Sequence, residues 1–211
     1  MISVGNNSKF IITILLVSVF LFGCGGAEER KAKYLERGIE YFNAQSFDKA
    51  AVEFKNVLQI DPKSAVPYYY LGRMDERNRD WRKAYVNYSK AVEYDPGYAE
   101  ARVRLGKFFA LSNKLAEAKE QANEAEKLTP GAPELQTLMA VIKMNENDLS
   151  GATVILENLL KDDAANTEAA SLLVTIFTNQ GDLDAALKVM EKAVEADNED
   201  LGLKARLAQV Y

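Results

Sequence analysis

Few residues in this chain have side chains suited to catalysis, and the missing residue types exclude most enzyme mechanisms. The 211 residues include no histidine and a single cysteine, Cys24. The chain therefore lacks the commonest general base and metal ligand, and one cysteine can form neither an internal disulfide nor a zinc cluster. No glycine-rich phosphate loop is present either. The sequence predicts a protein that is not an enzyme and that uses no metal and no cofactor.

Four basic residues remain as candidates, and the chemistry open to them is the binding of carboxylates. They are Arg73, Arg77, Arg104 and Lys107. Arginine presents a planar fork of donors to a carboxylate, and arginine and tyrosine are frequent anchors at protein interfaces. These side chains could hold an acidic segment of a partner, with Tyr69 stacking on it. Alternatively, they are ordinary solvated charges, one of them neutralised by Glu76.

The overall charge argues against nucleic acid as the partner. The chain has 26 basic and 31 acidic residues, which gives a formal net charge of −5. A general nucleic-acid binder needs a basic surface to neutralise phosphates. We therefore expect no nucleic-acid partner.

A repeat of about 34 residues positions these side chains. Its clearest copy, residues 65–98, reads as two amphipathic helices, the second beginning after Asp80 and ending at Asp95-Pro96. Small residues recur where two helices would cross closely: Gly38, Gly72, Gly106 and Ala140, then Ala50, Ala84, Ala118, Ala152 and Ala186. Large residues recur between them: Tyr34, Tyr41, Phe54, Tyr68, Tyr88, Phe109 and Phe177.

This pattern resembles the tetratricopeptide repeat (TPR) family over residues 31–200. The resemblance implies an all-α solenoid, a right-handed superhelix of antiparallel helix pairs, in which each pair buries its apolar face by stacking on its neighbours. Five repeats are expected: 31–64, 65–98, 99–132, 133–166 and 167–200. Residues 201–211 are expected to begin a sixth, truncated repeat in a longer protein; the alternative is a short capping helix.

The turn inside each repeat has its own signature. Ser46, Asp80, Asp148 and Asp182 are predicted helix N-caps. Asn113, Asn147 and Gly181 precede the second helix of their repeats, where a left-handed backbone favours Gly and Asn. Lys114 departs from the cap pattern, and Gln45 and Arg79 depart from the turn pattern.

In TPR arrays the first helices line a concave face that usually holds the partner's peptide. Residues three and four apart share one stripe of a helix. The resulting candidate groove residues are Leu35, Ile39, Phe42, Tyr69, Arg73, Arg77, Val103, Arg104, Lys107, Val141 and Met144. This groove would have an apolar end near the N-terminus and a basic, aromatic middle.

The N-terminal 23 residues are predicted to be a signal peptide, with Lys9 before an apolar run over residues 10–22. The run ends in Leu21-Phe22-Gly23-Cys24, which resembles the lipobox of bacterial lipoproteins except at Phe22. The resemblance implies cleavage before Cys24 and acylation of that cysteine, which anchors the protein to a membrane. The alternative is an ordinary secretory signal or an N-terminal membrane helix.

Residues 24–30 are expected to form the lipidated N-terminus and a short tether. In lipoproteins retained in the inner membrane, the residue after the acylated cysteine resembles aspartate. In this chain that residue is Gly25. The expected location is therefore the bacterial cell envelope, at the periplasmic face of the outer membrane.

Together these features predict a membrane-anchored scaffold that binds segments of other envelope proteins. A lipoprotein signal followed closely by repeats of this type resembles the N-terminal part of large TPR lipoproteins associated with exosortase and exopolysaccharide export. Two alternatives stay open. One is a pilotin-like lipoprotein that assists the assembly of a secretin or type IV pilus. The other is the N-terminal docking region of a longer enzyme.

Overall fold

The computed structural model of the chain describes residues 26–196. The predicted signal peptide, Cys24 and the predicted sixth repeat at residues 201–211 lie outside this range. No helix in the described part of the chain is long and apolar enough to cross a membrane.

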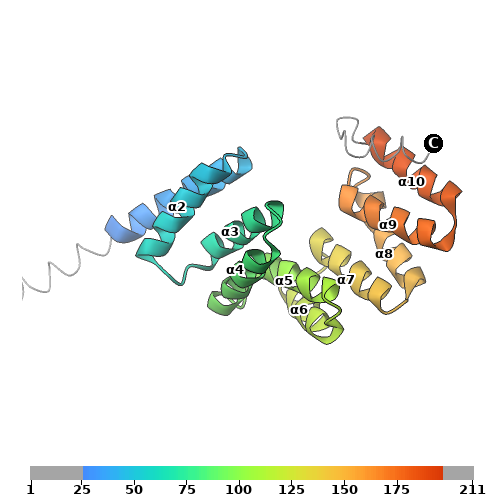
Figure 1. Cartoon of the computed structure of the whole chain (residues 1–211), viewed down its shortest axis with the longest axis horizontal. Coiled ribbons are helices and arrows are strands. Elements are labelled where there is room, and N and C mark those ends of the chain that lie inside the picture. Colours follow the sequence, from blue (N-terminus) through green and yellow to red (C-terminus); the bar gives the residue numbers. More distant parts are fainter. Residues whose placement is uncertain (1–25, 197–211) are drawn as a thin grey trace, which may run out of the picture. The chain divides into compact units, whose positions relative to one another are not determined.

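Residues 26–196 form ten helices and no strand, so the all-α prediction is confirmed (Figure 1). The first helix spans residues 26–43. It is followed by α2 (Phe47–Ile60), α3 (Ala65–Arg77), α4 (Trp81–Tyr94), α5 (Ala99–Leu111), α6 (Leu115–Leu128), α7 (Pro133–Asn145), α8 (Leu149–Asp162), α9 (Thr167–Gln180) and α10 (Leu183–Ala196). The helices therefore come in pairs, and each predicted repeat contains one pair.

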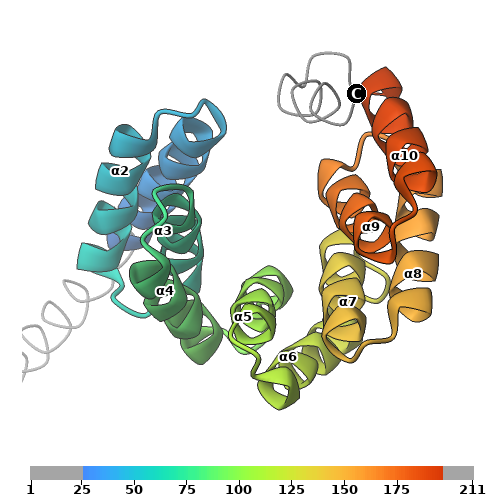
Figure 2. The same cartoon turned by 45° about the vertical axis from the view of Figure 1, so that its right-hand side comes forward.

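The chain divides into two compact units, which we describe separately. Unit 1 ends at Asp95, and unit 2 begins at Pro96. In unit 1, α3 contacts both α2 and α4, and α3 and α4 lie side by side (Figure 2). In unit 2, each helix from α5 to α10 contacts the next, and α7 also contacts α5 and α9. Each helix pair in unit 2 is thus covered by its neighbours, as stacking of repeats requires.

The first helix begins earlier than the sequence indicated. Residues 26–30 were expected to form part of a tether, but they are helical. Two ion pairs span successive turns here, one between Lys31 and Glu28 at 2.7 Å and one between Lys33 and Glu29 at 2.9 Å. Pairs three and four residues apart stabilise a helix, which accounts for the extension toward the N-terminus.

Two of the recurring glycines, Gly38 and Gly72, lie where a side chain would collide with a ring from the second helix of the pair. A Cβ atom on Gly38 would lie 2.7 Å from the ring of Phe54, and one on Gly72 would lie 2.8 Å from the ring of Tyr88. Both rings are fully buried. The glycines therefore allow the two helices to approach closely enough to enclose an aromatic ring.

The turn inside every repeat has a residue with a left-handed backbone. Asn113, Asn147 and Gly181, which were predicted to fill this turn, have φ values of 55°, 63° and 77°. Gln45 and Arg79 share the conformation, with φ values of 56° and 61°. The repeat geometry therefore overrides residue type at these two positions, and each carries the strain of a side chain in the left-handed region.

Replacing Arg79 with glycine is expected to stabilise unit 1 by roughly 0.5–1 kcal/mol, because glycine adopts a left-handed backbone without steric strain. Urea titration followed by the fluorescence of Trp81, the single tryptophan of the chain, would measure this change. The matched control is Arg82→Gly inside α4, which should lower stability instead. A loss of stability with Arg79→Gly would contradict the assigned turn.

The four predicted N-cap residues precede their helices, and three of them make a side-chain capping hydrogen bond. The carboxylates of Asp80, Asp148 and Asp182 accept hydrogen bonds from backbone N–H groups three residues later, at 3.3, 2.9 and 3.0 Å. A hydrogen bond from Lys143, with those from Gly151 and Ser150, lowers the pKa of Asp148 to about 2. Ser46 occupies the N-cap position of α2 as predicted, but its side chain makes no capping hydrogen bond. The first N–H groups of α2 therefore have no capping bond from this side chain.

Candidate functional site

A polar and aromatic hollow lies in unit 1, between the first helix pair and α3. Its lining residues, which we call the arginine–phenylalanine site, are Phe42, Asn43, Gln45, Phe47, Arg73 and Arg77. Its volume is about 340 Å³. The first four residues come from the end of the first helix, the turn and the start of α2, whereas the two arginines lie one helical turn apart on α3.

Each arginine of the site lies over its own phenylalanine ring. The guanidinium carbon of Arg73 is 4.7 Å from the ring centroid of Phe42, and that of Arg77 is 4.6 Å from the ring centroid of Phe47. The two ring centroids are 5.5 Å apart in an edge-to-face arrangement. Contact with a ring face stabilises a cation and fixes the plane of the guanidinium, which leaves its edge available to a ligand.

The acidic residues that lie between these arginines in the sequence face another helix. Asn87 of α4 donates a hydrogen bond of 2.7 Å to Asp75, and the Tyr88 hydroxyl donates one of 2.7 Å to Glu76. Burial raises the pKa of Asp75, and the hydrogen bond from Asn87 opposes this effect. Within residues 26–196, neither Arg73 nor Arg77 forms an ion pair with a carboxylate. α3 thus separates its charges between two faces, and the arginine face keeps its positive charge.

The other groove residues predicted in unit 1 contribute mainly to packing. Leu35 and Ile39 pack against a core cluster that contains Phe54 and Met74. Tyr69 is only 8% exposed, and its ring centroid lies 5.8 Å from the Arg73 guanidinium. The Tyr69 ring therefore packs near the Arg73 guanidinium, and too little of it is exposed for stacking on a ligand.

The groove residues predicted in unit 2 do not gather into a comparable site. Val103 is 3% exposed and belongs to the core, while Val141 and Met144 are half-buried against it. Arg104 is half-buried. Lys107 already has a carboxylate partner, because its Nζ atom lies 2.6 Å from Glu168. In unit 1, both predicted arginines line the arginine–phenylalanine site, whereas in unit 2 Lys107 is ion-paired within the unit.

Three residues of the arginine–phenylalanine site were absent from the predicted groove. Asn43 is the last residue of the first helix, Gln45 lies in the turn and Phe47 begins α2, whereas the predicted groove took only one stripe of each first helix. The 34-residue period carried a usable signal, because it aligns Gln45 with Asn113 and Asn147 in the turn. The amide side chains of Asn43 and Gln45 can both donate and accept hydrogen bonds.

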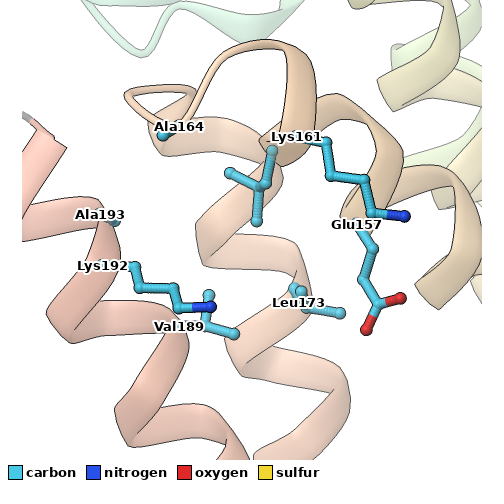
Figure 3. A pocket seen from close by; sticks show the side chains of 8 residues that line it. Glu157, Lys161, Ala164, Leu173, Val189, Lys192 and Ala193 are labelled. Atoms are coloured by element: carbon cyan, nitrogen blue, oxygen red, sulfur yellow. The ribbon is translucent and has the colours of Figure 1, made fainter.

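A second hollow, in unit 2, is largely apolar and has a volume of about 330 Å³. Figure 3 shows Leu173 between side chains of two other helices, with Glu157 and Lys161 on one side and Val189 and Lys192 on the other. Leu160, Ala164 and Ala193 complete the lining. None of the predicted groove residues lines this hollow. Among residues 26–196, no cluster of acidic, cysteine or histidine side chains is arranged to hold a metal ion.

Comparison with solved structures supports the fold. TTC0263, a thermophilic TPR protein of Thermus thermophilus, is 22% identical with a TM-score of 0.71, over 85% of this chain and 98% of its own. Pseudomonas aeruginosa pilF is 20% identical with a TM-score of 0.64, over 88% and 86% of the two chains. PilW, described as a type IV pilus biogenesis factor, is 18% identical with a TM-score of 0.68, over 85% of each chain. At these identities the likeness concerns the fold alone.

The family is established by sequence. No curated protein matches the chain. A family model described as tetratricopeptide repeat matches residues 76–142 and 143–210, which together make up more than half of the chain. The matched residues contain the paired helices from α4 to α10 and the recurring left-handed turns. The chain therefore belongs to the tetratricopeptide repeat family.

Proposed function

We propose that this protein is a non-enzymatic scaffold that holds a segment of another cell-envelope protein on its repeats. The observation that carries the proposal is the arginine–phenylalanine site. It presents two guanidinium groups that have no carboxylate partner among the described residues, beside two exposed amide side chains. Positioned arginines and aromatic rings are the groups that most often anchor protein interfaces. Membership of the tetratricopeptide repeat family agrees with a binding role.

The proposal includes an anchor to the membrane. The segment Leu21-Phe22-Gly23-Cys24 supports acylation of Cys24, with the repeats held at the periplasmic face of the outer membrane. A scaffold fixed there would meet only envelope proteins. Its partners would be components of an exopolysaccharide export or exosortase-type sorting system.

Capture of partners from intact cells tests the scaffold function. The protein is cross-linked in the native envelope and purified, and the proteins bound to it are identified by mass spectrometry. We expect a small, reproducible set of envelope proteins. The matched control is the same protein cross-linked after denaturation of the envelope, which should lose the set. Identical sets in both samples, or an empty set, would contradict the proposal.

Replacing Cys24 with serine is expected to abolish acylation and to leave an unprocessed precursor, because the serine hydroxyl cannot take the place of the modified sulfur. Intact-mass spectrometry of the membrane fraction measures both changes. Ser18→Ala, inside the apolar run, is the control and should be processed normally. A Cys24→Ser protein of mature mass that still carries acyl chains would contradict the lipid anchor.

A pilotin-like role is the second candidate. It is favoured by the fold likeness to pilF and to PilW, whose description is a type IV pilus biogenesis factor. The same capture experiment separates the candidates. Secretin or pilus subunits among the captured proteins would support the pilotin-like role, whereas export or sorting components would support the first.

A further inference from the structure

We propose that the arginine–phenylalanine site binds an extended acidic segment with carboxylates at alternate positions, Asp/Glu-x-Asp/Glu. This inference rests on the proposed scaffold function, because it names the ligand of that scaffold. It follows from the spacing of the two guanidinium groups and from the absence, among the described residues, of carboxylates that would satisfy them.

The spacing of the two cations follows from their positions on α3. Arg73 and Arg77 are four residues apart, which corresponds to about 6 Å along a helix. Each guanidinium is held over a different ring, and the ring centroids of Phe42 and Phe47 are 5.5 Å apart. Each guanidinium therefore has a position of its own and can hold its own carboxylate.

An extended peptide matches this spacing only at alternate residues. Successive residues of an extended chain rise about 3.3 Å, and their side chains point to opposite sides. Carboxylates two residues apart therefore lie on one side at a separation of about 6.6 Å. Adjacent carboxylates point in opposite directions, and carboxylates three residues apart are about 10 Å apart and also diverge.

The surroundings of the site favour an anion over a cation or an apolar group. Asp75 and Glu76 face α4, where Asn87 and Tyr88 donate hydrogen bonds to them. The exposed amides of Asn43 and Gln45 border the two cations. An extended peptide has no internal backbone hydrogen bonds, so these amides can pair with its N–H and C=O groups while the arginines hold its side chains.

The test is calorimetric titration of the full chain in detergent solution with three peptides. Each peptide has nine residues, glycine and serine apart from two glutamates, with an acetylated N-terminus and an amidated C-terminus to remove terminal charges. The glutamates are adjacent, two apart or three apart. The peptide with glutamates two apart is expected to bind about tenfold or more tightly than the other two, because only it can place one carboxylate on each arginine.

Variants assign the effect to the site. Arg73→Gln and Arg77→Gln should each weaken binding of the alternating peptide about tenfold and remove the preference for spacing. The matched control is Arg82→Gln, which changes an exposed arginine of α4 in the same unit and should leave binding unchanged. The double variant Arg73→Lys/Arg77→Lys keeps both charges but loses the planar fork, so its affinity should be intermediate. Thermal melts followed by circular dichroism confirm that each variant is folded.

Each contrary outcome has a defined meaning. Equal affinity for the three peptides, an equal loss with Arg82→Gln, or no binding of any acidic peptide would overturn the inference.

Repeating the envelope capture with Arg73→Gln/Arg77→Gln separates the peptide-binding inference from the scaffold function. An unchanged set of captured proteins would overturn the inference and leave the scaffold intact. Peptide binding as expected together with an empty wild-type capture would overturn the scaffold alone.

Discussion

Replacing Phe54 with alanine is expected to lower the free energy of unfolding of unit 1 by about 3–5 kcal/mol, the usual cost of truncating a buried phenylalanine. The Phe54 side chain is fully buried, and its ring is stacked on Tyr70 with the ring centroids 5.1 Å apart. The backbone at Gly38 comes close to the ring edge and cannot move in to fill the space. The substitution therefore leaves a cavity. Urea titration followed by Trp81 fluorescence reports on this unit.

The matched control for Phe54→Ala is Val52→Ala on the same helix. Val52 is 57% exposed, so its truncation should change stability by no more than about 0.5 kcal/mol. Similar losses in the two variants would mean that α2 does not pack through the face assigned to it. Phe54→Leu should fall between them, because leucine fills part of the cavity.

Replacing Gly72 with leucine is expected to destabilise unit 1 by about 1–3 kcal/mol, because the added side chain meets the buried ring of Tyr88. Even a single Cβ atom at this position would lie 2.8 Å from the Cε1 atom of that ring. The Tyr88 hydroxyl is held by Glu76, so the ring cannot turn away without losing a hydrogen bond. The shift in the midpoint of thermal unfolding, followed by circular dichroism, measures the effect.

The control for Gly72→Leu is Gly26→Leu, since Gly26 lies in a helix and its nearest outside atom is 3.6 Å away, on the flexible side chain of Arg30. It should unfold at the wild-type temperature or above. A compensating pair extends the test. Ala140 and Leu156 are buried in one cluster of unit 2, at the positions that correspond to Gly72 and Tyr88. Gly72→Ala/Tyr88→Leu should therefore be more stable than Gly72→Ala alone, and failure to recover stability would contradict the proposed collision.

The helix pairs and the close crossings within them could be predicted from the sequence, because the residues that form both recur every 34 residues. Gly72 and Tyr88 could be recognised from the sequence as a small residue at a helix crossing and a large residue that fills a gap. The left-handed backbone at Gln45 and Arg79 could not be predicted from residue type, because neither residue prefers it. It is imposed by the need to join two helices through the same short turn in each repeat.

The arginine–phenylalanine site was predicted only in part, for a different physical reason. Its arginines could be found because Arg73 lies on the predicted inner stripe of its helix and Arg77 lies beside that stripe. Their supporting rings could not be assigned, because Phe42 and Phe47 lie on either side of a turn in the preceding repeat. In unit 2, the partner of Lys107 is 61 residues away, and no local pattern connects such a pair.

The ion pair between Lys107 and Glu168 has a mechanical consequence for unit 2. Contacts between neighbouring repeats resist bending only locally, as in a one-dimensional chain. This pair joins α5 directly to α9 across the repeat that contains α7. It therefore resists bending of unit 2 in addition to the contacts between neighbouring repeats. Motion that separates α5 from α9 must break it. Because the Glu168 side chain is 52% exposed, salt screens the attraction, and the elastic stiffness of unit 2 should decrease as ionic strength rises.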